Sequence, residues 1–431
     1  MQLRGLWRHP DFLKLWAGET ISVFGSLIGR TALPFTAILV LDARPYQIAV
    51  LTAADIVPQL LMGLIAGVWV DRLRRRPLMI VSDIARAALL VSIPVAYAFD
   101  ALVIEHLYVV GLFVGMLTIF FDVAYLSYLP SLVKKEELLE GNSKLAASSA
   151  IAEVGAFGSV GWLVQLLSGP VTILIDAISF LFSALFVGLI RKPEPPPKAV
   201  EDREGVRREV VEGLRAIGGS PVLRAIAGSE VIVEFSFRVF GVVFMLYATR
   251  SLGFEPGVLG LTFAIGGISS FVGAIAAGRV AGRLGIGPSM AYGRMLMGAC
   301  MVVVPLATDS SLLSLGILAA LQLGDGCYMV ADINQISLRQ SITPEHVLGR
   351  VNATIRFVTL AAMLLGVLAG GVLGEVAGLR ATLVVGAAGT FLSGLWFVAS
   401  PVWRTRAAPT HERTAAVPLA VAFIPPSGDG E

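Results

Sequence analysis

The sequence has few of the residues that build soluble enzymes, disulfide frameworks or nucleic-acid surfaces. Only 15% of its 431 residues are charged and four are histidines, whereas about 25% of a soluble domain is charged. The two cysteines, Cys300 and Cys327, lie in apolar runs, which is typical of small buried side chains rather than of a disulfide or a metal pair. The formal net charge of +2 comes with no basic stripe, so we expect no nucleic-acid partner.

Apolar residues, by contrast, are in excess. They make up 56% of the chain before its 46 glycines are counted, and the mean hydropathy is +0.79. A soluble domain must cover its core with polar surface, and this excess is too large for that. Regular alternation over about ten residues, which is typical of an outer-membrane barrel, is missing. The composition therefore predicts an all-α integral membrane protein.

Reading for apolar runs of about 20 residues gives about twelve expected membrane spans. The first six are Phe12–Leu41, Gln47–Val70, Pro77–Phe99, His106–Leu132, Ser143–Leu167 and Val171–Ile190. The second six are Val222–Thr249, Gly257–Leu284, Pro288–Ala307, Ser311–Ser341, Val351–Val376 and Thr382–Val402.

Basic residues predict the orientation of these spans. With the N-terminus in the cytoplasm, roughly 25 of the 33 Lys and Arg residues fall on the cytoplasmic side and about 3 outside. An even number of spans returns the C-terminus to the cytoplasm. We therefore expect a multi-pass protein of the cell inner membrane with both termini cytoplasmic.

The chain divides into two similar halves. A shift of about 210 residues superimposes polar and small residues of the first half on the second; the matches include Asp122 with Asp332, Asn142 with Asn352, and Gly161 with Gly371. We expect an N-terminal six-helix bundle (1–190), a cytoplasmic linker (191–221), a C-terminal six-helix bundle (222–402) and a disordered cytoplasmic tail (403–431). The linker combines a proline run with an amphipathic helix over Arg207–Ile217, which we expect to lie on the membrane surface.

The loop between the second and third spans resembles a signature of the major facilitator superfamily, G-x-x-x-D-R-x-G-R-R. Gly67, Asp71, Arg72, Arg75 and Arg76 match it, whereas Arg74 replaces its second glycine. The second half repeats the loop from Gly278 to Gly285, with Gly282 where the acid belongs. The resemblance covers about residues 8–402 and implies twelve helices in two bundles related by a pseudo-twofold axis, with transport by alternating access.

Shorter segments resemble the branch of enterobactin exporters and macrolide-efflux proteins. These segments are Phe12–Ser26, Leu129–Val133, Asp176–Phe180 and Gly349–Asn352. Spans four and five depart from motifs that proton-exchanging members often carry: an Arg-x-x-Gln-Gly motif is replaced in Thr118–Tyr125, and a Gly-Pro-x-x-Gly-Gly motif loses its proline in Ala156–Gly161.

The resemblance also implies a cytoplasmic gate at the signature loop. Asp71 with Arg72 and Arg75 would hold span two against the start of span eleven at Arg350. Gly67 and Arg76 complete this loop, and Asp83 with Arg86, three residues apart in span three, extend the expected network. The alternative is that the loop arginines only anchor the topology.

Charges inside the spans are the candidate coupling residues, because each costs about 2.5–3.5 kcal/mol to insert. Acids outnumber bases there, and the unpaired carboxylates must be protonated, hydrated or bound to a cation. The proton-coupling candidates are Asp122, Asp332, Glu19, Glu153, Glu230 and Glu234.

Asp122 and Asp332 are the sharpest of these candidates because they occupy equivalent depths in spans four and ten. The alternative is that each bonds an arginine such as Arg30 or Arg356 and holds the halves together. Glu234 has Arg238 one turn away as a structural partner, whereas Glu230 has no obvious partner in the sequence. Glu153 fits either a proton site or an ion pair with an arginine.

The predicted function is secondary active export of an amphipathic small molecule, a drug-like compound or a siderophore, by proton-coupled antiport. The substrate-cavity candidates are Arg30, Asp55, Tyr125, Arg238, Asp325, Asn334, Gln335 and Arg356. Alternatives are export of a metal cation or lipid, and a non-transporting sensor or scaffold. A membrane enzyme is disfavoured because all four histidines lie near span ends, in loops or in tails. No nucleotide or metal motif is found, so we expect no cofactor, and we expect a monomer in the bilayer.

Overall fold

The computed structural model describes residues 5–62, 69–70, 73–194 and 206–407. The first half contains α1 (Pro10–Leu39), α2 (Pro45–Met62), α4 (Arg75–Ala98), α5 (Ile104–Leu132), α6 (Leu138–Leu167) and α7 (Gly169–Gly188). The second half contains α9 (Pro221–Leu246), α10 (Pro256–Leu284), α11 (Ile286–Val302), α12 (Leu312–Ile342), α13 (Glu345–Val376) and α14 (Leu379–Val398). A shorter helix, α8 (Val206–Gly219), precedes the second half.

The helices confirm the predicted all-α membrane architecture. Among the described residues, eleven helical segments are long and apolar enough to cross a membrane, and α2 adds the remaining long helix of the first half. Some ends differ from the expected spans. α9 passes into a π turn at Tyr247–Ser251, and α14 ends at Val398 ahead of a 3-10 turn at Pro401–Arg404.

Local sequence explains where several helices begin. Proline stands in the first turn of α1, α7, α9 and α10, where its missing amide hydrogen costs nothing. Ser220 and Ser311 cap α9 and α12 by accepting hydrogen bonds from backbone amides three residues on, each at 3.3 Å. Before α12, hydrogen bonds from Ser311 hold the pKa of Asp309 below its usual range.

Small residues let the helices of each half pack closely. A Cβ added to Gly29 of α1 would lie 2.1 Å from a carboxylate oxygen of Asp176 on α7. In the second half, a Cβ on Gly298 of α11 would lie 2.5 Å from the backbone nitrogen of Phe391 on α14. Close backbone approach of this kind is typical of helix association in membranes. We call the two resulting groups the N bundle (α1–α7) and the C bundle (α9–α14).

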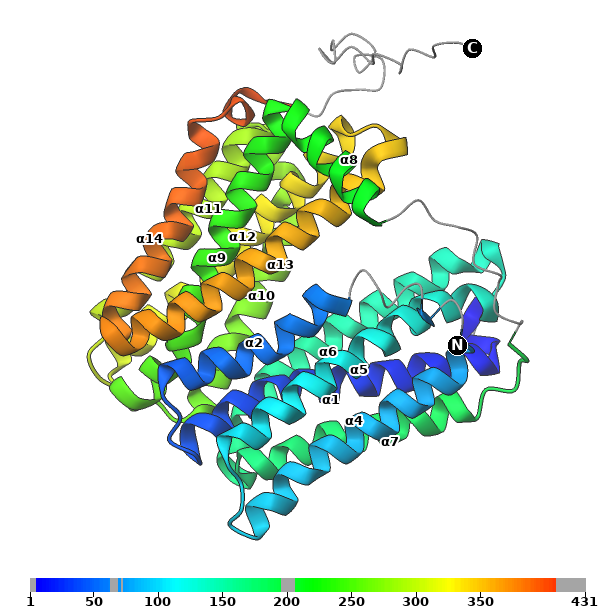
Figure 1. Cartoon of the computed structure of the whole chain (residues 1–431). Helices are drawn as coiled ribbons and strands as arrows, with labels where there is room; N and C mark the ends of the chain where they lie inside the picture. Colours follow the sequence, from blue (N-terminus) through cyan, green and yellow to red (C-terminus); the bar gives the residue numbers. More distant parts are fainter. Residues whose placement is uncertain (1–4, 63–68, 71–72, 195–205, 408–431) are drawn as a thin grey trace, which may run out of the picture.

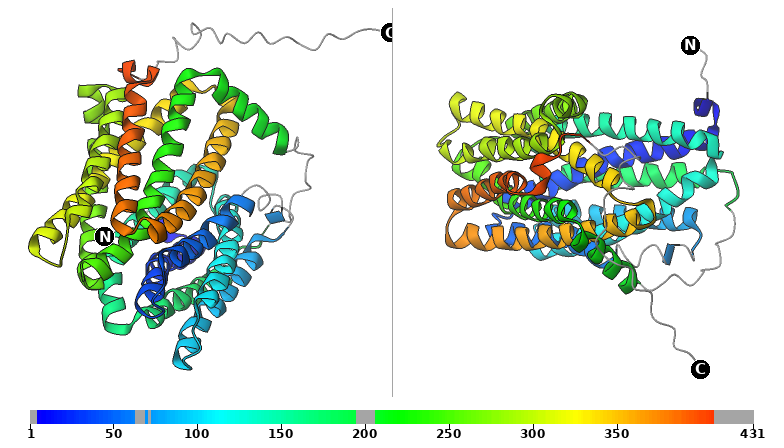
Figure 2. Two further views of the ribbon diagram at one scale, coloured as in Figure 1. Left: turned by 60° about the vertical axis from the view of Figure 1, so that its left-hand side comes forward. Right: turned by 90° about the horizontal axis from the view of Figure 1, so that it is seen from above.

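The two bundles meet at one end and diverge toward the other (Figure 1). The left view of Figure 2 shows the same separation from a second direction. At the meeting end, which we call the closed end, a Cβ on Gly161 of α6 would lie 2.0 Å from the carbonyl oxygen of Pro256 on α10. A Cβ on Gly371 of α13 would lie 2.4 Å from that of Ala49 on α2. The closed end is therefore in tight contact through small residues of both bundles.

Polar contacts reinforce the closed end. Arg250 of the C bundle lies 2.7 Å from Asp42 of the N bundle and donates a hydrogen bond to the carbonyl oxygen of Ile38 at 3.0 Å. The amide of Gln165 donates to Glu255 at 2.8 Å. These contacts join the loop after α1 and the end of α6 to the segment between α9 and α10 of the C bundle.

At the diverging end, α8 packs on α13. The close approach requires a glycine, because a Cβ on Gly213 would lie 2.1 Å from Oγ1 of Thr354 and 2.7 Å from the carbonyl oxygen of Arg350. Glu212 of α8 forms an ion pair with Arg350. The linker helix therefore docks on the C bundle, on the helix that also faces the cavity described below.

Candidate functional site

A cavity of about 530 Å³ lies mainly within the N bundle and is closed on one side by α13. Its charged and polar lining consists of Ser26, Arg30, Asp55, Gln59, Thr118, Asp122, Asp176 and Arg356. Its apolar lining includes Leu60, Val114, Ile119, Val123, Leu126, Phe180, Phe357 and Leu360. A mixed lining of this kind suits a small molecule with both an apolar body and charged or polar groups.

Three predicted substrate-cavity residues, Arg30, Asp55 and Arg356, line this cavity. A guanidinium nitrogen of Arg30 lies 2.9 Å from a carboxylate oxygen of Asp55, so these two charges compensate each other across α1 and α2. Arg356 and Asp122 are both exposed to the cavity. Asp122 makes no ion pair within 4.0 Å in the described part of the chain, so the alternative of a bond to an arginine such as Arg30 or Arg356 is not seen there; Arg30 is paired with Asp55 instead.

Asp176 also lines the cavity, although in the sequence it stands out only as part of the family-like segment Asp176–Phe180. The residue is only 4% exposed, and it accepts hydrogen bonds from the hydroxyl groups of Ser26 at 3.3 Å and Ser179 at 3.4 Å. An aspartate that is buried within a membrane span and bonded to two serines is a sign of a functional role. The sequence could not show the pairing of Asp176 with Ser26, because Ser26 lies on another helix, 150 positions away in the chain.

In the N bundle, Arg86 of α4 is buried and bonded within its own helix. It forms a short ion pair with Asp83, three residues earlier, and donates a hydrogen bond to Oγ1 of Thr118 at 3.2 Å. Its guanidinium group lies 4.5 Å from the ring centre of Phe121 and 4.0 Å from that of Phe180. Two aromatic faces and one carboxylate therefore hold this cation.

In the C bundle, Arg294 of α11 is fully buried and joins three helices. It lies 2.7 Å from Glu230 of α9 and donates a hydrogen bond to the side-chain oxygen of Gln335 of α12 at 2.8 Å. The amide nitrogen of Gln335 in turn donates to Glu230 at 2.5 Å. Glu230, which has no obvious partner in the sequence, thus has two partners in the structure.

Glu234 and Asp332 lie beside this cluster. The hydroxyl group of Tyr328 donates a hydrogen bond to Glu234 at 3.1 Å, and Arg238 lies 3.9 Å from the same carboxylate. The structural pairing of Glu234 with Arg238 is therefore present, but at the outer limit of an ion pair. Asp332 is half-buried and lies within electrostatic range of Glu230, Glu234 and Arg294.

The other predicted cavity and coupling residues lie outside the cavity lining. Tyr125 stacks on Phe121, with ring centres 6.2 Å apart. Asn334 donates hydrogen bonds to the carbonyl oxygens of Val330 and Ala277 and so joins α12 to α10. Asp325 faces α10, where a Cβ on Gly266 would meet its carboxylate at 2.5 Å. Glu153 of α6 is exposed.

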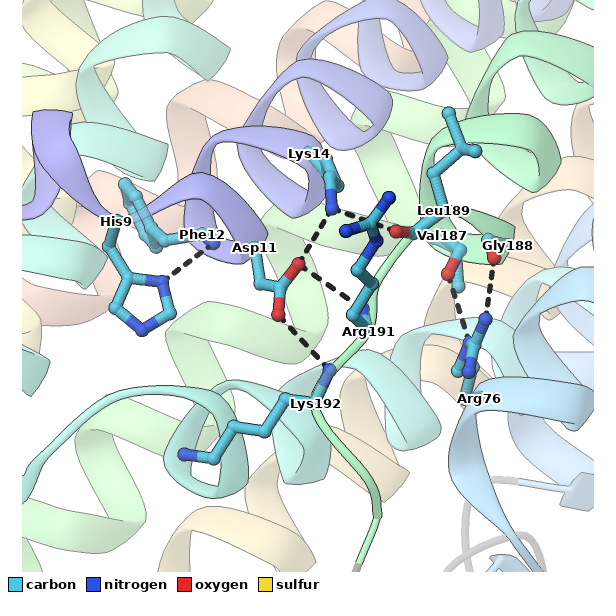
Figure 3. A network of polar contacts seen from close by, with 10 residues as sticks. All are labelled: His9, Asp11, Phe12, Lys14, Arg76, Val187, Gly188, Leu189, Arg191 and Lys192. Atoms are coloured by element: carbon cyan, nitrogen blue, oxygen red, sulfur yellow. Dashed lines mark hydrogen bonds and ion pairs between the residues drawn. The ribbon is translucent and has the colours of Figure 1, made fainter.

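Of the predicted gate residues, Gly67, Asp71 and Arg72 lie outside the described residues. The backbone amides of Arg75 and Arg76 donate hydrogen bonds to Glu194 at 2.7 and 3.2 Å. Glu194 therefore provides hydrogen-bond acceptors for two free backbone amides at the start of α4. The guanidinium group of Arg76 donates to the carbonyl oxygens of Val187 and Gly188 at the end of α7 (Figure 3). These contacts fasten the N bundle internally.

The same network continues along the N bundle (Figure 3). Asp11 lies 2.8 Å from Nζ of Lys14 and accepts hydrogen bonds from the backbone amides of Arg191 and Lys192 at 3.2 and 3.1 Å. Arg350, the remaining gate residue, pairs with Glu212 of the linker helix. The described contacts of Asp83 and Arg86 are with groups inside the N bundle rather than with the loop arginines.

Cysteine and metal chemistry have no built site in the described part of the chain. Cys300 and Cys327 are both free thiols. No group of three or more His, Cys, Asp or Glu side chains close enough to hold a metal ion is found among the described residues. The chemistry that the described cavity offers is recognition by carboxylates, guanidinium groups and apolar walls.

Comparison with known proteins places the chain among membrane transporters. A family model described as Major Facilitator Superfamily matches residues 16–358. The multidrug efflux pump Tap of Mycolicibacterium fortuitum is 26% identical over 386 residues, which cover 88% of this chain and 92% of Tap.

Solved structures share the fold. A bacterial homologue of the iron transporter ferroportin in its inward-facing state is 19% identical, with a TM-score of 0.72 over 92% of this chain and 99% of that one. The outward-facing state of a bacterial ferroportin homologue gives a TM-score of 0.57 at 18% identity, over 90% and 98% of the two chains.

Proposed function

Because the chain belongs to the major facilitator superfamily, we propose that it is a secondary active transporter that exports an amphipathic small organic molecule in exchange for protons. The observation that carries this proposal is the cavity, in which three aspartates and two arginines face apolar walls at membrane depth. The Arg30–Asp55 pair compensates itself, and the rest of the charged lining consists of two aspartates, Asp122 and Asp176, and one arginine, Arg356. The cavity therefore favours a substrate with an apolar body and a positively charged group.

The arrangement of the bundles supports a cavity that opens to the cytoplasm. α8 and both described chain ends lie at the diverging end (Figure 1). With the termini cytoplasmic, as the basic residues predict, the closed end faces outward and the cavity opens to the cytoplasm. The higher TM-score to the inward-facing neighbour, 0.72 against 0.57, supports this assignment. The name of the Tap relative, a multidrug efflux pump, supports the direction.

The direct test uses the full-length protein in proteoliposomes with ethidium, a lipophilic organic cation, as the probe. We expect an imposed pH gradient to drive ethidium movement, and ethidium to move protons in turn, as reported by a pH dye inside the vesicles. Asp122→Asn removes one cavity carboxylate and is expected to weaken ethidium binding about tenfold, since 1.4 kcal/mol corresponds to that factor. Glu105→Gln, at an exposed position of α5 outside the cavity lining, is the matched control.

Three results would contradict the proposal. If Asp122→Asn left ethidium binding unchanged, the cavity would not be the binding site. Ethidium transport that ignores the pH gradient would remove proton exchange. Competition by Fe²⁺ at low concentration, with no effect of organic cations, would favour a metal cation as the substrate.

A further inference from the structure

The two bundles carry the same three charges at equivalent positions. Glu19, Arg86 and Asp122 of the N bundle lie about 210 positions before Glu230, Arg294 and Asp332 of the C bundle. Each set takes its glutamate from the first helix of a bundle, its arginine from the third and its aspartate from the fourth. The partner of the arginine is what differs between them.

In the C bundle the arginine bonds the glutamate. Arg294 lies 2.7 Å from Glu230, and Gln335 hydrogen-bonds to both. The glutamate therefore has a cation and an amide to stabilise its negative charge, and it has no need of a proton.

In the N bundle the arginine forms its ion pair with a different acid. Asp83 forms the ion pair with Arg86, and the position equivalent to Asp83 in the C bundle is occupied by Ala291. Oε2 of Glu19 is shielded from solvent and has no hydrogen-bond partner among the described residues. A shielded carboxylate that lacks its own cation is costly at membrane depth, and a proton removes that cost.

The groups facing Glu19 come from two helices. α4 contributes Asp83 and Arg86, and α5 contributes Asp122 and Tyr125, all within electrostatic range of Glu19. On α7, Asp176 is held to α1 through Ser26, farther along the helix. Because Arg86 is paired with Asp83, it forms no ion pair with Glu19 or Asp122, and the negative charges of these two residues face one another.

We propose that Glu19 is the carboxyl group that carries the transported proton, and that Asp83 is the positioning residue that keeps Arg86 from neutralising it. This inference rests on the proposed function and names the group that performs its proton exchange. Glu19 takes a proton from water on one side of the membrane and returns it to water on the other. Because Asp122 lines the cavity, a cation bound there and a proton on Glu19 compensate the same negative charge and exclude each other.

The first readout needs no substrate. Infrared difference spectra of the purified protein report the carbonyl stretch of a protonated carboxyl group as the pH is raised. We expect Glu19→Gln to remove one such band. Asp83→Ala, which copies the C bundle, is expected to remove the same band, because Arg86 then turns to Glu19 and keeps it ionised. Glu230→Gln is the matched control and is expected to leave the band in place.

The second readout is ethidium movement in proteoliposomes. Glu19→Gln is expected to lose transport driven by a pH gradient and to keep ethidium exchange between compartments of equal pH. Retained exchange shows that binding and alternating access persist, so a failure of the proton site is distinguishable from a failure of the proposed function. Asp83→Asn serves as a second variant with a smaller change of shape.

Three outcomes would overturn the inference. The band persists in Glu19→Gln, or disappears in Glu230→Gln, in which case the protonated group lies elsewhere. Alternatively, pH-driven transport survives in Glu19→Gln at wild-type rate. Asp83→Ala that retains both the band and the coupling would remove Asp83 from the mechanism.

Discussion

The N and C bundles share a pattern of charges but use it differently. Arg294 bonds groups on two other helices and so ties α9, α11 and α12 together. Arg86 is bonded to an acid on its own helix and otherwise rests on aromatic rings and one hydroxyl group. One additional acid, Asp83, accounts for this difference. Under the proposed role of Glu19, the repeat uses the same glutamate position for a structural ion pair in the C bundle and for a proton site in the N bundle.

The cavity follows the same asymmetry. All but four of its lining residues come from the N bundle, and those four come from α13 alone. The bundle with the internally bonded arginine is therefore the bundle that lines the cavity, and the bundle with the three-helix cluster supplies a wall.

Removing the C-bundle cation is expected to have the largest effect. Arg294→Met leaves the mostly buried Glu230 without its cation, which is expected to lower the free energy of unfolding by about 3–5 kcal/mol. The double variant Glu230→Gln/Arg294→Met removes both charges and should recover most of that loss. Thermal unfolding in detergent measures both. Equal stability of the single and double variants would show that the pair is not the source of the loss.

Giving the C bundle the missing acid should make it resemble the N bundle. Ala291 is fully buried, and Ala291→Asp places a carboxyl group one turn before Arg294, where it competes with Glu230. We expect a loss of about 1–3 kcal/mol in stability from the added volume. We also expect a new infrared band of a protonated carboxyl group. Ala291→Asn is the control for volume, and a spectrum unchanged from wild type would argue that the extra acid does not redirect the arginine.

A methyl group at the closed end should push the bundles apart. Gly161→Ala forces a Cβ against the backbone of Pro256, whereas the neighbouring variant Gly158→Ala meets only the Cβ of Ala264 at 3.9 Å. Strain of about 1–3 kcal/mol would shift the balance of conformations about 5- to 150-fold away from the closed contact. Spin labels at Arg44 and Ser251 report the separation. An unchanged distance distribution would show that the helices accommodate the methyl group without rocking.

The polar contact at the same end is expected to matter least. Asp42 is 93% exposed, so the Arg250–Asp42 pair is largely hydrated. Arg250→Gln is expected to change the balance of conformations by about 0.2–1 kcal/mol, with a smaller effect in high salt. Arg44→Gln, which removes an arginine from the loop that contains Asp42, is the control. A shift as large as that of Gly161→Ala would mean that the ion pair, rather than the packing, holds this end shut.

Hydropathy and the repeat were sufficient to predict the membrane fold, because spans are set by length and apolar composition. Sequence spacing also indicated the Glu234–Arg238 pair, which lies within one turn of a helix. Asp83 and Arg86 were expected only as an extension of the cytoplasmic gate, and the structure shows them as an ion pair. It could not indicate the pairing of Glu230 with Arg294, since helix packing brings together residues 64 positions apart. The cavity role of Asp176 depends in the same way on how α7 packs against α1.

Because α8 docks through Gly213, the linker helix belongs structurally with the C bundle. The linker helix is fastened to Arg350 and Thr354, which belong to the second repeat. A break in the chain between residues 195 and 205 would therefore leave each fragment with its own described intrabundle contacts and leave α8 with the second fragment. We expect two separately encoded polypeptides, divided there, to assemble into one transporter through the glycines of the closed end.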